Sequence, residues 1–124
     1  MTLEELYREI GGDYAQAMKI LRIEKLLDKH IRKLPENPIF DHLAKAGETM
    51  DPTTLFEASH AVKGVCGNLG LTELYALAVE LSEEFRPGNA RRHTDAEVKK
   101  LLEDTDALYQ KAVVGIREYE QNVQ

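Results

Sequence analysis

The stretch Ala58–Gly70, ASHAVKGVCGNLG, places two glycines, Gly64 and Gly67, inside a segment whose apolar spacing predicts a helix. A glycine in a helix interior costs about 0.5–1 kcal/mol relative to alanine, because more backbone freedom is lost on folding. At about 100° per residue, the apolar side chains gather on one face, which we expect to be buried. These residues are Leu55, Ala58, Val62, Val65, Cys66 and Leu69. His60 lies on the opposite face together with both glycines, which leave bare backbone beside an exposed histidine.

The chain around this stretch predicts an all-α protein. It has no tryptophan and no Val/Ile/Thr runs typical of strands, and Leu, Ala, Glu and Lys recur at spacings of three and four. Caps, prolines and glycines predict helices over Thr2–Ile10, Tyr14–Leu34, Pro38–Lys45, Pro52–Gly70, Leu71–Phe85 and, after the Thr94–Glu97 capping box, to about Gln121. Short connections favour antiparallel neighbours. We therefore expect an antiparallel up-and-down four-helix bundle in one domain, residues 1–124, with its core over about 14–121 and a flanking N-terminal helix within 1–12.

The helix expected from Tyr14 carries apolar residues on two sides. The stripe expected to face the core is Ile20, Ile23, Leu27, Ile31 and Leu34. Nearly opposite lie Tyr14, Met18 and Leu21. This second set either receives the first helix, through Leu3, Leu6 and Ile10, or forms with Phe56 an apolar surface on which a partner docks.

Composition excludes several classes of function. The net charge of −6 and pI near 5.2 argue against a nucleic-acid or anionic-membrane surface, so we expect protein partners. The single cysteine, Cys66, excludes an internal disulfide, and it falls on the buried arc as a small core residue. No signal peptide or long apolar run is present. These features predict a cytoplasmic protein, and we expect it to be a monomer.

His60 and Lys63 together suit phosphate chemistry. Neutral imidazole is a good nitrogen nucleophile near pH 7, and Lys63 follows one turn later on the same side. A phosphoryl group placed on His60 would carry negative charge that the Lys63 ammonium could stabilise by hydrogen bonding.

The stretch HAVKGVCGNLG resembles the phosphoacceptor motif of histidine phosphotransfer (HPt) domains, in which the corresponding residues here are His60, Lys63, Gly64 and Gly70. The following LTELYALAVELSE is similar to the next helix of that family, and the helical layout fits over about Tyr14–Tyr119. The resemblance implies a phosphocarrier of two-component phosphorelays. His60 would accept a phosphoryl group from an aspartyl phosphate, or from a kinase, and pass it to a response-regulator aspartate.

The resemblance also implies which groups this chain does not supply. The partners would be receiver domains of response regulators or of hybrid histidine kinases, and the receiver would hold Mg²⁺ and most of the catalytic groups. This chain would then bind no cofactor and no metal and would not itself be an enzyme. We expect a freestanding carrier, because no kinase or receiver domain is attached and the chain begins with Met1; a piece of a larger protein is the alternative.

The neighbours of His60 have simpler interpretations as well. We expect Gly64 to give access to the imidazole, whereas Gly67, which the motif does not fix, either gives access or lets a neighbouring helix pack closely. Asn68 either assists at the site or helps to close the helix before Gly70. Glu57 is expected to be a solvated carboxylate rather than a group that orients the imidazole. No chemistry is assigned to His30, His42 and His93.

Three rival classes of protein would also be helical bundles. A helical interaction module that binds receiver or kinase domains without phosphorylation is the main alternative, and the intact His60, Lys63 and Gly64 argue against it. A metal- or haem-binding bundle would need ligands converging on the core, and no Glu-x-x-His motif occurs. A self-contained transferase or hydrolase would need a general base and a second functional cluster.

Overall fold

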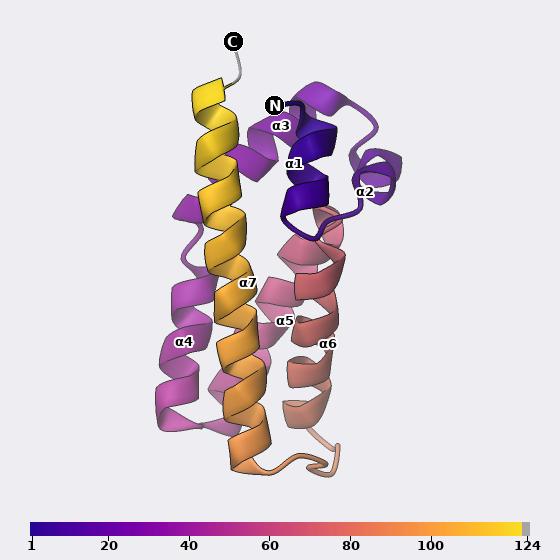
Figure 1. Cartoon of the computed structure of the whole chain (residues 1–124). Helices are drawn as coiled ribbons and strands as arrows, with labels where there is room; N and C mark the ends of the chain where they lie inside the picture. Colours follow the sequence, from indigo (N-terminus) through magenta and orange to yellow (C-terminus); the bar gives the residue numbers. More distant parts are fainter. Residues whose placement is uncertain (123–124) are drawn as a thin grey trace.

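The protein is a helical bundle in which α5, the helix of His60, pairs most extensively with α6 (Figure 1). The computed structural model describes residues 1–122, and every regular element within them is helical. The elements are α1 (Leu3–Glu9), α2 (Tyr14–Leu21), α3 (Glu24–Lys33), the 3-10 turn η1 (Leu34–Glu36), α4 (Ile39–Thr49), α5 (Pro52–Asn68), α6 (Thr72–Phe85) and α7 (Asp95–Asn122). The predicted all-α fold is confirmed.

Four helices, α4 to α7, form the antiparallel bundle. In Figure 1, α4 and α6 lie on either side of α7, and α5 lies behind it. Helices α5 and α7 therefore face each other across the bundle. The outer face of α5, which carries His60, and the outer face of α7 are on opposite sides of the molecule.

Side-chain caps form at the starts of α1, α5 and α7, among them the predicted Thr94–Glu97 box. Thr2 with Glu5 and Thr94 with Glu97 make reciprocal capping boxes. At the start of α5, the Asp51 carboxylate accepts a hydrogen bond from the Thr54 amide at 2.9 Å. These caps satisfy backbone amides that have no partner within their own helices.

Gly70 ends the helix of His60, as its position in the sequence predicts. Its φ is +66°, and the Leu71 amide reaches back to the Cys66 carbonyl at 2.9 Å. A Cβ at Gly70 would lie 2.8 Å from the carbonyl oxygen of Asp13. Only glycine fits this left-handed turn without strain and without a clash.

The prediction of a single helix over Tyr14–Leu34 is wrong, because the helix is interrupted at Arg22. Arg22 has φ +66°, in the left-handed region, and α3 restarts after Ile23 without a side-chain cap. Helices α2 and α3 meet in an elbow, across which the Tyr14 hydroxyl bonds to Glu24 at 3.1 Å.

The break changes which residues of this segment are buried. Leu27, Ile31 and Leu34 are in the core as predicted, but Ile20 and Ile23 are 42% and 56% exposed. The α-helical period predicts one continuous stripe, whereas the elbow turns the residues beside the break outward. Tyr14, Met18 and Leu21 are half-buried against the core, and Tyr14 makes an edge contact with Tyr7 of α1 at a centroid distance of 6.1 Å.

The short helix predicted over Pro38–Lys45 is longer than expected and belongs to the bundle. It runs over Ile39–Thr49, and the Asn37 side chain accepts a hydrogen bond from the Ile39 amide at 3.1 Å. It ends at Met50, which has φ +57°. In Figure 1, α3, η1 and α4 follow one another along α7. Together they pack on α7 where the helix predicted over Tyr14–Leu34 was expected.

Helix α1 packs between the C-terminal end of α5 and α7. The buried Tyr7 hydroxyl donates to the Leu69 carbonyl at 2.6 Å, and the Asp13 amide donates to the Gly70 carbonyl at 2.8 Å. On the other side, Ile10 packs where a Cβ at Gly115 of α7 would lie only 2.6 Å from it. The first helix is therefore packed into the fold at the end of the His60 helix.

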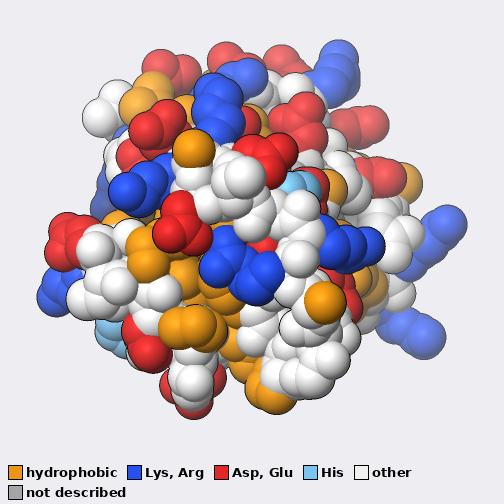
Figure 2. Space-filling model, turned by 90° about the horizontal axis from the view of Figure 1, so that it is seen from below, with side chains coloured by type: hydrophobic (Ala, Val, Ile, Leu, Met, Phe, Trp, Pro, Cys, Tyr) orange, Lys and Arg blue, Asp and Glu red, His pale blue; other side chains and the backbone are white. Residues whose placement is uncertain are grey.

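The connection from α6 to α7 is held by a buried carboxylate. Glu84, 2% exposed, accepts hydrogen bonds from Arg91 at 2.6 Å and from the backbone amides of Arg92 and His93. Burial alone would raise the pKa of Glu84, but these hydrogen bonds outweigh it and hold the pKa below its usual value. Figure 2 views this end of the molecule and shows acidic and basic side chains interspersed with hydrophobic ones.

Candidate functional site

His60 lies exposed in the middle of α5, while the opposite face of the helix is buried. Leu55, Val62 and Cys66 are at most 1% exposed. Ser59, next to His60, is also fully buried and donates its hydroxyl proton to the Leu55 carbonyl at 2.6 Å. Val65, which the periodicity predicts to be buried, is only half-buried. The helix therefore presents His60 to solvent from a firmly packed support.

The imidazole of His60 stacks on Phe56, one turn earlier. Their ring centroids are 5.5 Å apart with an interplanar angle of 26°. Phe56 is half-buried, and the Arg86 guanidinium lies 5.3 Å from its ring centroid. The ring of Phe56 thus restrains one side of the imidazole, and Glu57 remains exposed.

Gly64 and Gly67, the two glycines on the His60 face, have different surroundings. A Cβ at Gly64 would meet nothing within 4 Å, apart from the helix's own backbone. A Cβ at Gly67 would lie 3.1 Å from Cε1 and 3.3 Å from Cδ1 of Tyr75 on α6. The space beside Gly64 is open to solvent, whereas Gly67 accommodates a neighbouring side chain. Of the two interpretations of Gly67, its surroundings therefore favour close packing of the neighbouring helix α6.

Lys63 and Arg86 place two cations on the α6 side of His60. Arg86 pairs with Glu83 at 3.0 Å. The pKa of Glu83 lies below its usual value, mainly because of the hydrogen bond from Arg86, and the charge of Lys63 adds to the effect. Glu83 therefore forms an ion pair with Arg86, and Lys63 lies near enough to act on it through its charge.

Sequence reasoning missed Arg86 and Glu83. The RPG sequence that begins at Arg86 ends α6, and its composition indicates only a connection between helices. These residues come close to Phe56 and Lys63 because α6 runs antiparallel to α5, which brings the end of one beside the start of the other. No local pattern in the sequence reports that pairing.

Asn68 lies on another part of the surface. It is the last residue of α5, about 12 Å along the helix axis from His60, so it does not reach the imidazole. It borders a groove of about 500 Å³ between the α2–α3 elbow and α5. The groove is lined by Ile20, Leu21, His30, Lys33, Leu34, Asn37, Val65, Asn68 and Leu69.

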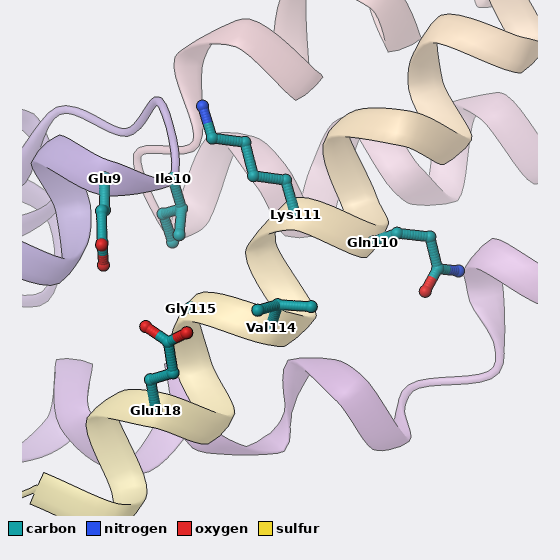
Figure 3. Close-up of a pocket in the computed structure, with 7 residues that line it drawn as sticks. All are labelled: Glu9, Ile10, Gln110, Lys111, Val114, Gly115 and Glu118. Atoms are coloured by element: carbon teal, nitrogen blue, oxygen red, sulfur yellow. The ribbon is translucent and has the colours of Figure 1, made fainter.

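A second groove, of about 330 Å³, lies between α1 and α7 (Figure 3). Val114, 58% exposed, is at its centre beside Gly115, with Lys111 and Glu118 on either side along α7. This groove is on the side of the bundle away from the outer face of α5. It is separate from the surroundings of His60.

The remaining candidate residues have structural surroundings in the part of the chain that the structure describes. Among residues 1–122, no three His, Cys, Asp or Glu side chains are grouped so that they could hold a metal ion. Burial raises the pKa of the Cys66 thiol to about 12, so this cysteine stays protonated in the core. His93 lies 3.4 Å from Glu80 beside the α6–α7 connection. No helix within the described part of the chain is long and apolar enough to span a membrane.

Comparison with protein families matched the Hpt domain over residues 19–111. The match covers most of the chain and includes His60, Lys63 and both glycines. The protein therefore belongs to the Hpt domain family, whose members carry phosphoryl groups on histidine in phosphorelays and interact with receiver and kinase domains. The comparisons gave no match to a curated protein or to a solved structure.

Proposed function

We propose that the protein is a phosphocarrier whose acceptor is His60. The observation that carries this proposal is the exposed imidazole beside Gly64, where an added Cβ would meet nothing within 4 Å. An aspartyl phosphate on a partner can approach such a ring closely. The family match over residues 19–111 supports the same reaction class.

The transfer needs only a nucleophile from this chain. A nitrogen of the neutral imidazole attacks phosphorus, and the bond between phosphorus and the aspartyl oxygen breaks, returning its electron pair to the carboxylate. The new phosphoimidazole is attacked in turn by the aspartate of a second receiver, which regenerates the imidazole. Lys63, one turn after His60, stabilises the phosphoryl charge in the interval by donating a hydrogen bond to the phosphate.

We assign the catalytic groups and Mg²⁺ to the receiver, so that this chain acts as a carrier rather than as an enzyme. Phosphoryl transfer depends mainly on positioning and on neutralising charge, and a divalent cation supplies much of the latter. The imidazole of His60 has the Phe56 ring and the Lys63 and Arg86 cations nearby, and within residues 1–122 no group of three carboxylate, His or Cys side chains could hold the ion here. We also expect the carrier to be monomeric and to work in the cytoplasm with these partners.

The receiver docks, in this proposal, over the outer face of α5 and the groove beside it. The exposed side chains of Ile20, Ile23 and Leu26 lie at the α2–α3 elbow, and Ile20 lines the groove with Asn68. An exposed apolar surface with a polar rim is typical of a transient protein interface. The alternative docking surface, Tyr14, Met18 and Leu21 with Phe56, is partly buried against the core.

The experiment is to mix the protein with a receiver domain phosphorylated on its aspartate and to follow acid-labile phosphate on the carrier. Parent protein and a His42→Gln control should gain phosphate, whereas His60→Gln should gain none and keep its melting temperature. Phosphate on His60→Gln would show that the acceptor is another residue. Receiver binding without transfer to the parent would instead favour the phosphorylation-independent interaction module.

A further inference from the structure

Gly67 and Tyr75 form a contact pair beside the exposed face of α5. Because a Cβ at Gly67 would come within 3.1 Å of the Tyr75 ring, the glycine lets that ring lie against the backbone of α5. Tyr75 is nevertheless 39% exposed. The ring is thus supported on one side by α5 and open to solvent on another.

The position of this pair relative to His60 is set by the helix. Gly67 follows His60 by seven residues, which is about 20° from it around the axis and about 10 Å along it. A protein interface of ordinary size covers about 800 Å² on each partner, equal to a disc of roughly 16 Å radius. A receiver that brings its aspartate to His60 therefore also covers the Gly67–Tyr75 pair.

We propose that Tyr75 is a receiver-contacting residue, held in position by Gly67, and that this pair sets receiver affinity rather than the rate of phosphoryl transfer. The proposal rests on the proposed function of His60. Tyrosine offers a large contact area for only two rotatable side-chain bonds, and it is enriched among residues that dominate binding energy. At about 10 Å along α5 from the acceptor, the pair is too far away to touch the transferred group.

The first test is titration of an isolated receiver domain into the parent protein and three variants, with transfer rates measured at saturating receiver. Tyr75→Ala should weaken binding about fivefold to thirtyfold, with the saturated transfer rate unchanged. Tyr75→Phe, which keeps the ring, should bind within about twofold of the parent. Val114→Ala removes a side chain that is 58% exposed on α7, away from this face, and should bind like the parent.

The second test asks whether Gly67 acts through Tyr75. Gly67→Ala should displace the ring and weaken binding in the parent, but it should have little further effect in the Tyr75→Ala background. Equal effects in both backgrounds would overturn the link between the two residues.

Three further results would overturn the role of Tyr75. These are unchanged receiver affinity in Tyr75→Ala, an equal loss of affinity in Val114→Ala, or a change only in self-association of the chain. The binding titration also separates this proposal from the proposed function. Weaker binding by Tyr75→Ala, with no phosphate reaching His60 in the parent, would retain the docking role and reject the carrier. Normal transfer to the parent, with unchanged receiver affinity in Tyr75→Ala, would retain the carrier and reject the docking role of Tyr75.

Discussion

At the scale of single residues, the two glycines beside His60 have different physical roles. Gly64 leaves open space, whereas Gly67 admits the ring of Tyr75. The sequence places both on the His60 face through the helical period alone. It cannot distinguish their surroundings, because the side chain that decides between them comes from α6.

Replacing Gly64 tests whether it serves access to His60. Gly64→Ala should raise the free energy of unfolding by up to about 1 kcal/mol, because alanine favours the helix and its Cβ meets no neighbour. Gly64→Gln should slow phosphotransfer more than Gly64→Ala, because its side chain occupies the approach to the imidazole. Thermal melting and transfer rates from one receiver measure both effects. Loss of stability in both variants, with transfer at the parent rate, would make Gly64 a packing residue.

Lys63→Ala tests the proposed stabilisation of the phosphohistidine. Without the ammonium, the half-life of the phosphorylated carrier should fall about threefold to tenfold, since a charge-assisted hydrogen bond is lost. The measurement is the decay of acid-labile phosphate after removal of the receiver. Lys99→Ala, which removes an exposed lysine of α7, is the matched control. Equal half-lives for Lys63→Ala and the parent would reduce Lys63 to a surface charge.

At the scale of elements, the α2–α3 elbow marks the limit of what the sequence predicts. Leu27 and Ile31 could be assigned to the core because their spacing matches the helix that forms. The break at Arg22 could not be foreseen, because no Gly, Pro or Asn stands there and apolar residues flank it on both sides. Packing of α2 against α5 and of α3 against α7 overrides the local preference for one helix.

The elbow makes a prediction about Arg22. Left-handed φ is costly for a residue with a Cβ, so Arg22→Gly should raise the free energy of unfolding by about 0.5–1 kcal/mol after the entropy of glycine in the unfolded chain is deducted. Denaturant unfolding measures the change. Lys19→Gly, inside α2, should instead lower the free energy of unfolding by about 1 kcal/mol. If Arg22→Gly is as destabilising as Lys19→Gly, the helix continues through this position in solution.

At the scale of the whole molecule, α1 belongs to the same fold although it precedes the matched range 19–111. Its Tyr7 hydroxyl donates to the Leu69 carbonyl, next to the end of the His60 helix. Tyr7→Phe should lower the free energy of unfolding by about 1–2 kcal/mol, because a buried carbonyl loses its partner. Denaturant unfolding and phosphotransfer are measured together. Unchanged stability would mean that α1 does not pack on α5 in solution, and a loss of transfer by the folded protein would extend the site to α1.

Helices α5, α6 and α7 and the exposed face of α5 could be predicted from capping residues and apolar spacing, whereas the full length of α4 and its place in the bundle could not. The residues of other helices that lie beside this face could not be predicted. Phe56 is adjacent to His60 through the helical period, but Arg86 and Tyr75 reach this surface through the antiparallel pairing of α5 and α6, which depends on the folded chain.

The most direct test of the central claim is a relay through the protein from one receiver to a second. Phosphorylated carrier is purified away from the first receiver and mixed with an unphosphorylated second receiver, and phosphate is followed on both. We predict that the second receiver gains the phosphate that the carrier loses, and that His60→Gln, taken through the same steps, delivers none. Delivery of phosphate by His60→Gln, or phosphorylated parent that loses phosphate only to water, would contradict the account.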